Sequence, residues 1–200
     1  DLGLIKKIGD PRVLVLIKEN STYIEGAIVE AIIKDKLIED GYRLVDDEQV
    51  SLIRQTEEAK EAIAGNDNIA KQIAQQNKAD IIIVGETFEK DNGEIEAYGV
   101  SVKSIEIGIN LKGIKVDNGE MILSENMSII KSNPASNNLA IKQGLEEIAK
   151  TITEGGKYKG KKIISLSNKI AKALLKKQSI QVTLYEVDSE DYLKIIDLLK

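Results

Sequence analysis

The sequence contains no histidine, cysteine or tryptophan among its 200 residues. Without histidine and cysteine the chain cannot build a Ser-His or Cys-His nucleophile, a thiolate metal site or an imidazole ligand. Any catalysis would have to use Asp, Glu, Lys, Tyr or Ser, and the sequence shows no such constellation. The missing cysteines leave the redox compartment open, because reducing and oxidising compartments both tolerate a chain without them.

Long apolar stretches are missing as well, since no run approaches the roughly 18 residues that suggest a membrane span. The net charge of −5 is mild and argues against a nucleic-acid-binding protein. The composition is otherwise ordinary for a globular chain, with 42% hydrophobic and 30% charged residues. A length of 200 residues suits one large domain, or one domain and a small one. The chain begins at Asp1 without a signal peptide or lipidation motif, so we expect a processed or recombinant form.

Apolar patterning predicts an α/β fold with a mixed sheet. Continuous apolar runs at 12–17 and 80–85 are typical of strands that are covered on both faces, and a short strand is expected at 42–46. Helical patterns separate these runs, which favours parallel pairing among the early strands. Beyond Gly85 the apolar residues alternate, at 105–111 and again at 121–129, as in antiparallel strands with one wet face.

Helix boundaries are marked by capping residues. Thr22 and Glu25 have the spacing of a capping box and should open the first helix. Asp46 should cap a second helix that continues to Ile63. An amphipathic helix in the second half of the chain should begin near Ser136.

The tetrapeptide Asp-Asn-Gly-Glu occurs twice, at 91–94 and at 117–120. Each copy places Asn-Gly between β-patterned runs, which predicts type I′ hairpin turns. A calcium loop needs about six oxygen ligands over a dozen residues, and neither copy has that spacing. Both copies are therefore interpreted as structural turns.

One uninterrupted strand from Glu94 to Val116 would be too long for a compact domain. The parity of the apolar positions slips between Val102 and Ile105, and again at Gly113. We therefore expect a break or a bulge at each of these two places.

Charge is distributed most unevenly near the C-terminus. No acidic residue lies between Glu154 and Glu186, but eight lysines do: Lys157, Lys159, Lys161, Lys162, Lys169, Lys172, Lys176 and Lys177. The structural interpretation is that the lysines form the solvated face of a basic helix. The apolar stripe of this helix would be Ile163, Leu166, Ile170 and Leu174. The alternative is a surface for an anionic partner: a protein, phospholipid headgroups or a cell-wall polymer. Nucleic acid is disfavoured, because only Tyr158 offers a nearby aromatic ring for stacking.

The other candidate sites have structural explanations. The acidic cluster at 46–48 fits a helix N-terminus, where negative charge complements the helix dipole. The Gly/Lys stretch at 155–162 lacks the preceding strand and the Ser or Thr of a phosphate-binding loop, which favours a flexible linker. A ligand pocket at the carboxyl ends of the early strands stays open as an alternative. Its residues would be Asp46, Gly85, Glu86 and Thr87. We predict no catalytic residue, metal or cofactor.

The predicted domain organisation has four parts. Residues 1–10 form a leader, and residues 11–153 form the α/β domain. A Gly/Lys linker follows at 154–162. Residues 163–200 then carry two helices and one strand, which cannot make a self-standing sheet and read as part of a second α/β module.

Five segments, taken in order over residues 10–152, resemble the middle domain of the flagellar assembly protein FlgT. They are PRVLVLI, IVEAIIKDKLIEDGYRLVDDEQVSLIR, ADIIIVGETF, VDNGEMILSENMSI and NNLAIKQGLEEIAKTI. The chain is similar, more distantly, to related domains of the curli-secretion lipoprotein CsgG, the penicillin-binding-protein activator LpoB and the N-terminal domain of TolB. Asn118-Gly119 stands where such relatives commonly have Thr-Gly.

This resemblance implies a mixed-sheet α/β domain that works in the bacterial envelope, often from a lipid-anchored parent. It implies no enzyme activity and supplies no catalytic residues. We therefore expect a periplasmic or outer-membrane-associated module that binds proteins, including copies of itself, in a flagellar, secretion or envelope assembly. Two alternatives are a small-ligand or nucleotide-binding α/β protein, and a binder of anionic membrane surfaces through the Lys157–Lys177 segment.

Overall fold

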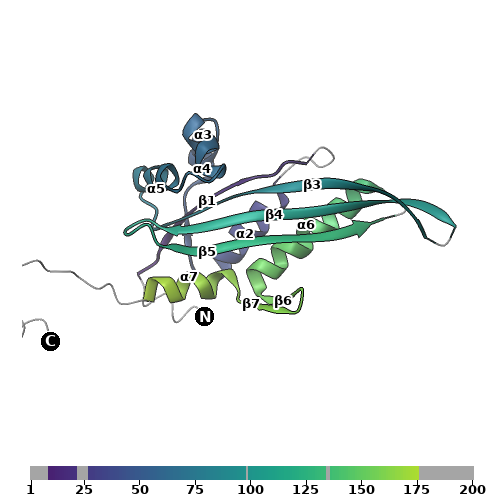
Figure 1. Cartoon of the computed structure of the whole chain (residues 1–200). Helices are drawn as coiled ribbons and strands as arrows, with labels where there is room; N and C mark the ends of the chain where they lie inside the picture. The colour runs from purple at the N-terminus through teal and green to yellow at the C-terminus, as the bar shows by residue number, and fades with distance from the viewer. Residues whose placement is uncertain (1–8, 22–26, 98, 134–135, 176–200) are drawn as a thin grey trace, which may run out of the picture.

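The computed structural model describes residues 9–21, 27–97, 99–133 and 136–175. The elements follow one another along the chain as labelled in Figure 1. They are β1 (Arg12–Lys18), α2 (Ile28–Glu39), β2 (Arg43–Leu44), α3 (Asp47–Arg54), α4 (Glu57–Ile63), α5 (Asp67–Gln76), β3 (Ile81–Ala97), β4 (Val100–Lys115), β5 (Met121–Ser132), α6 (Asn137–Glu154), β6 (Gly156–Tyr158), β7 (Lys161–Ile163) and α7 (Leu166–Leu175).

The main sheet has five strands in the order β2-β1-β3-β4-β5. Strand β1 runs parallel to both β2 and β3, whereas β3, β4 and β5 are joined by antiparallel pairs. The prediction of a mixed sheet, parallel early and antiparallel late, is confirmed. The strands adjacent to β1 are linked through helices, which is the connection that parallel pairing requires.

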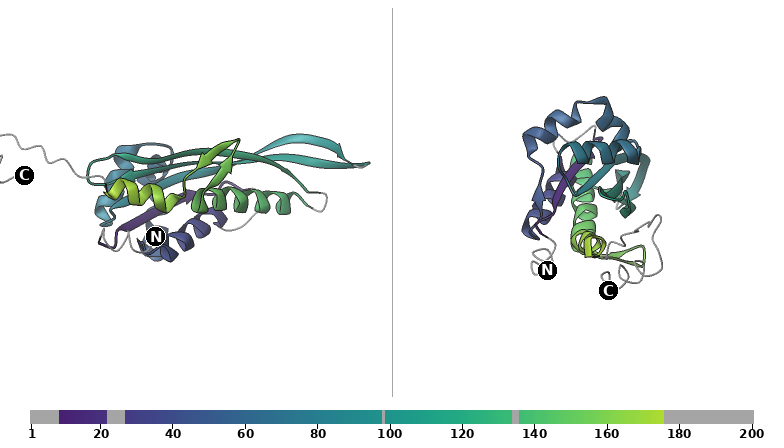
Figure 2. Two further views of the ribbon diagram at one scale, coloured as in Figure 1. Left: turned by 90° about the horizontal axis from the view of Figure 1, so that it is seen from below. Right: turned by 90° about the vertical axis from the view of Figure 1, so that its left-hand side faces the viewer.

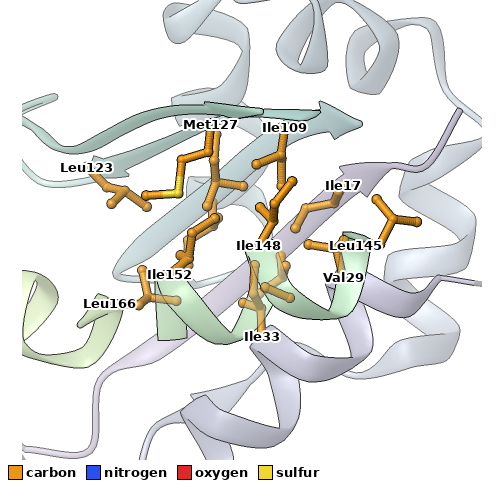
Figure 3. Packing of buried hydrophobic residues seen from close by; sticks show 14 of the residues in the cluster. Ile17, Val29, Ile33, Ile109, Leu123, Met127, Leu145, Ile148, Ile152 and Leu166 are labelled. Atoms are coloured by element: carbon orange, nitrogen blue, oxygen red, sulfur yellow. The ribbon is translucent and has the colours of Figure 1, made fainter. Parts of the chain in front are cut away.

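Helices cover the two faces of the sheet unequally (Figure 2). On one face α2, α6 and α7 enclose the larger core, where Ile33, Leu145 and Ile148 point toward the strands (Figure 3). On the other face α3, α4 and α5 pack over Leu14 and Ile82 and their neighbours. Both faces of β1 and of the first part of β3 are therefore buried, which is why their sequences are continuous apolar runs.

Helix α2 takes its N-terminal cap from a distant residue. The carboxylate of Glu19 accepts hydrogen bonds from the backbone N–H groups of Ile28 at 2.8 Å and Glu30 at 2.9 Å. Burial raises the pKa of Glu19, although these backbone hydrogen bonds oppose the shift. The predicted capping box at Thr22 and Glu25 lies outside the described residues.

Two other caps are confirmed and one predicted helix is wrong. Asp46 accepts from Glu48 N at the start of α3, and Ser136 accepts from Leu139 N at the start of α6. The expected helix from Asp46 to Ile63 is two helices, because Thr56 leaves the helical conformation and caps α4 with its hydroxyl. A capping residue within a helical apolar pattern ends one helix and starts another, and the spacing of apolar residues does not indicate this.

The two Asp-Asn-Gly-Glu copies do different things, and neither is a type I′ turn. The second copy does connect two strands, β4 and β5, but only glycine among its residues has a positive φ, 73° at Gly119. A type I′ turn needs positive φ at both central residues. The first copy is not a turn, since it lies inside β3, where the register with β4 shifts between Asp91 and Glu94.

This shift is a β-bulge in a very long hairpin. As expected, residues 94–116 do not form one strand, because β3 ends at Ala97 and pairs with β4 from Val100 onward. Strand β4 itself runs without a break over Val100–Lys115. The expected irregularities are confirmed, one opposite Ser104 and one at Gly113 in the pairing with β5. Asp91 accepts from Gly93 N at 2.8 Å and stabilises the first bulge, whose extra residue increases the local twist that Figure 1 shows.

The predicted flexible linker at 154–162 is wrong in conformation. Strands β6 and β7 form a two-stranded hairpin there, with Tyr158 paired to Lys161. Its two central residues, Lys159 and Gly160, have φ values of 46° and 78°, as a type I′ turn requires. The proposed division of the chain into 1–10, 11–153, 154–162 and 163–200 stays a prediction.

Helix α7 packs against the main sheet. The predicted apolar stripe is confirmed for Leu166, Ile170 and Leu174, which pack in or against the larger core from α7. The fourth predicted residue, Ile163, packs against that core from β7, so the helix begins later than predicted. The strand and helix expected after Leu175 lie outside the described residues. No helix in the described ranges combines the length and hydropathy needed to cross a bilayer.

Candidate functional site

The structure places Asp46 apart from the other three residues of the predicted ligand pocket, Gly85, Glu86 and Thr87. Asp46 follows β2, which pairs with β1 only near Val13, whereas Gly85 pairs with Ile17 on the other side of β1. Val13 and Ile17 are four residues apart, which corresponds to about 13 Å along β1. The polar groups of β3 beside the end of β1 are already engaged: Thr87 Oγ1 accepts from Asn20 N, and Glu86 accepts from the Asn20 side chain.

A charged cluster that the sequence did not reveal bonds the edge of β1 that β2 leaves unpaired. Strand β2 covers that side of β1 only at Arg12 and Val13. Beyond it, Glu30 Oε2 accepts from Ile17 N at 2.9 Å, and Arg54 Nη1 donates to Ile17 O at 2.7 Å. Two side chains thus replace a neighbouring strand, which is one way in which proteins prevent edge-to-edge association.

The same cluster lines a hollow of about 560 Å³ between α2 and α3. Glu30 is 3% exposed and forms ion pairs with Arg54 at 2.6 Å and Lys34 at 2.7 Å. Lys34 also pairs with Asp47 at 2.7 Å. Burial lowers the pKa of Lys34, but its hydrogen bonds to Asp47 and Glu30 outweigh burial and raise it overall. Each of these four charges is balanced within the cluster, so the cluster stabilises the fold and leaves no spare charge for a ligand.

Of the eight lysines in the predicted surface for an anionic partner, six lie in the described residues, and five of these six are exposed. Those five, called the lysine surface below, are Lys157, Lys159, Lys161, Lys162 and Lys172. Lys169 differs, because its side chain is largely covered and forms an ion pair with Glu125 of β5. Lys176 and Lys177 lie outside the described residues.

The hairpin that carries four of these lysines is fastened to the edge of the sheet by Tyr158. Its hydroxyl accepts from Ser128 N at 2.8 Å and donates to Ser128 O at 2.9 Å. Burial favours a higher pKa for Tyr158, but the hydrogen bonds from Ser128 and Lys159 outweigh it and lower the pKa. One side chain thus satisfies both outward backbone groups of an edge-strand residue. Strand periodicity could not have revealed this contact.

Replacing Tyr158 with phenylalanine should lower the free energy of unfolding by about 1 kcal/mol, because both bonds to Ser128 are lost. Hydrogen exchange at the Ser128 amide should accelerate more than exchange in the centre of β4. Tyr42→Phe is the matched control, since its hydroxyl donates to Ser167 O at 3.0 Å, away from β5. Faster Ser128 exchange in the control as well would contradict the assignment.

The far end of the β3–β4 hairpin projects beyond the rest of the sheet (Figures 1 and 2). Strand β1 ends opposite Glu86, and β5 ends opposite Ser104. Residues 94–97 and 100–103 therefore pair only with each other among the described residues, and together with the bulge at 91–93 they are called the ribbon below. Glu94 pairs with Lys103 and Glu96 with Ser101, which places these four side chains on one face of the ribbon.

The ribbon carries a local charge network at its base. Lys103 Nζ lies 3.3 Å from Asp91 Oδ2, and Ser101 donates to Glu94 at 2.7 Å. The hydrogen bond from Gly93 N and then the Lys103 ammonium lower the pKa of Asp91. Across the described residues, no group of three or more Asp or Glu side chains is arranged to hold a metal ion.

Comparisons with known proteins give likenesses of fold only. No family model matches the chain, and no curated protein is similar to it in sequence. The lipoprotein GNA1162 of Neisseria meningitidis is 16% identical, with a TM-score of 0.43 over 71% of this chain and 97% of that one. The C-terminal domain of LpoB from Salmonella enterica is 17% identical, with a TM-score of 0.37 over 64% and 93%. The PelC dodecamer of Paraburkholderia phytofirmans is 15% identical, with a TM-score of 0.34 over 70% and 85%. With all three TM-scores below 0.5, these likenesses carry no argument about function.

Proposed function

We propose that the chain is a non-enzymatic protein-interaction module of the bacterial cell envelope, and that the ribbon is the part that docks onto a protein partner. The observation that carries this proposal is the projection of the ribbon beyond β1 and β5. A two-stranded antiparallel ribbon is marginally stable by itself in water. A partner that pairs with its edges or covers its faces would stabilise it.

The rest of the sheet supports this interpretation by contrast. In the body of the molecule, Glu30 and Arg54 bond the backbone of Ile17 on one side of the sheet, and Tyr158 bonds the backbone of Ser128 on the other. In the ribbon, the carboxylate of Asp91 accepts from Gly93 N inside the bulge, but no side chain among the described residues bonds the backbone groups of 94–97 or 100–103. The chain thus protects its edges where association would be unwanted and leaves them accessible at its projecting end.

The absence of catalysis rests on the sequence. The chain has neither histidine nor cysteine, and the acidic side chains around Glu30 and Asp47 are neutralised by their partners. The envelope location follows from the resemblance of residues 10–152 to the FlgT middle domain and to the CsgG, LpoB and TolB domains. A role in a flagellar, secretion or other envelope complex, and self-association within it, belong to the same proposal.

Site-specific photo-crosslinking tests the ribbon as the docking part. A crosslinking amino acid at Glu96 or Ser101 should capture one defined partner from envelope fractions, or a second copy of the chain. Excess unlabelled chain should abolish that capture by competition. The control positions are Glu57 and Lys60 on α4, which are exposed and lie on a different element.

Two results would contradict the proposal. One is equal capture from the ribbon and from α4, which would indicate nonspecific contact. The other is a strict monomer in light scattering that gives no crosslink at either ribbon position in envelope fractions. A large thermal shift with a nucleotide or a sugar would instead favour the small-ligand alternative.

A further inference from the structure

We propose that the lysine surface binds the anionic headgroups of phospholipids and holds this side of the molecule against a membrane. This role is separate from docking by the ribbon, and it uses different elements. The hairpin β6–β7 and helix α7 lie together along the β5 side of the molecule (Figures 1 and 2). The ribbon extends away from them.

The first argument is the arrangement of charge within the hairpin. Lys157 and Lys162 are directly opposite each other in the β6–β7 pair, so they share one face, while Tyr158 and Lys161 share the other. Like charges at directly opposite positions destabilise a hairpin. No acidic side chain among the described residues forms an ion pair with either lysine. The hairpin therefore tolerates a repulsion that an anionic surface would relieve.

The second argument is that the hairpin is rigidly presented. Tyr158 bonds both backbone groups of Ser128, and Ile163 packs against the larger core. Gly155 fits closely against the following segment, where an added Cβ would lie 2.9 Å from Ile163 O. The lysines therefore stand on a fixed element and not on a loose tail, which reduces the ordering required on binding.

The third argument is the sorting of lysines and apolar side chains along α7. Lys169 faces the sheet and pairs with Glu125, whereas Lys172 is exposed. Two large apolar side chains are exposed at the two ends of this segment, Ile164 at 39% and Leu175 at 45%. Exposed lysines flanked by exposed apolar residues are the composition of interfacial membrane contacts. A soluble acidic protein would use the lysines but not the two apolar side chains.

The test is flotation of the full chain with two kinds of vesicles, pure phosphatidylcholine and phosphatidylcholine mixed with phosphatidylglycerol. Binding should occur only with the anionic vesicles and should be lost at high salt. Each lysine near an anionic surface contributes about fivefold in affinity, so K157Q/K162Q should weaken vesicle binding by about 25-fold. The same variant should melt at the same temperature or higher, because it removes a like-charge pair.

Two control variants separate this role from a structural one. K78Q/K90Q removes two exposed lysines on the side of the sheet opposite the hairpin and should leave vesicle binding unchanged. K169Q should lower the melting temperature, because it leaves Glu125 without its cation, and should not change vesicle affinity by more than about twofold.

Several outcomes would overturn the proposal. They are no binding to anionic vesicles at low salt, equal binding to both kinds of vesicles, and equal losses in K157Q/K162Q and K78Q/K90Q. Binding to a soluble acidic polypeptide but not to vesicles would assign the lysine surface to a protein partner instead. The ribbon crosslinks described above do not depend on these lysines, so either proposal can fail while the other stands.

Discussion

Replacing Glu30 with alanine should lower the free energy of unfolding by about 3 kcal/mol. Glu30 is 3% exposed, and its carboxylate binds three partners at once: the backbone N–H of Ile17, the Arg54 guanidinium and the Lys34 ammonium. Alanine leaves the Ile17 N–H without an acceptor and two cations without their counter-charge. Urea-induced unfolding with a constant m-value would measure the loss.

A double-mutant cycle tests whether Glu30 and Arg54 act as a unit. Arg54 is more exposed than Glu30, so R54A alone should cost less, about 1 to 2 kcal/mol. The double variant E30A/R54A should cost clearly less than the sum of the two single variants, because no unpaired guanidinium remains. Strict additivity would contradict the idea that these two side chains together replace a strand beside β1.

Replacing Gly85 with alanine should cost about 3 kcal/mol through overpacking. An added Cβ would lie 2.2 Å from the backbone oxygen of Asn110 and 3.1 Å from Leu111 Cα, so β3 and β4 would have to separate. Backbone atoms held in a sheet cannot move aside as the tip of a side chain can. Thermal unfolding should show a large fall in melting temperature for this single added methyl group.

Gly108→Ala is the matched control for this prediction. An added Cβ there would lie 2.1 Å from the Phe88 ring, but that ring is only partly buried and can rotate toward solvent. We expect a cost of about 1 kcal/mol. Equal costs for the two variants would show that the β3–β4 pairing at Gly85 is not as rigid as its geometry indicates. The close approach of β4 explains why residue 85 is a glycine. The predicted ligand pocket at Asp46, Gly85, Glu86 and Thr87 stays a prediction.

The parts of the fold that depend on residues close together in the sequence were predictable. Continuous apolar runs placed β1 and the start of β3, and the caps at Asp46 and Ser136 placed the starts of α3 and α6. Each of these signals is encoded within a few residues and is independent of the rest of the chain. The apolar stripe of α7 was predictable for the same reason.

The two Asp-Asn-Gly-Glu copies show where local signals stop being sufficient. The first copy lies within β3 because the pairing with β4 continues past it, and the long hairpin absorbs one extra residue of β3 as a bulge. Asn-Gly favours a type I′ turn only when the flanking strands can pair across it. The type I′ conformation is found instead at Lys159-Gly160, in a stretch whose composition indicated a linker.

By itself, the sequence determined the α/β class, the caps of two helices and the eight lysines near the C-terminus. Only the tertiary structure decided how the lysines within the described residues are used: Lys169 forms an ion pair with Glu125, whereas Lys157 and Lys162 are opposite each other in the β6–β7 pair. It also decided how the sheet edges are closed, by Glu30 and Arg54 on one side and by Tyr158 on the other. The physical reason is that periodicity and capping act over a few residues, whereas register and ion pairing join residues far apart in the chain.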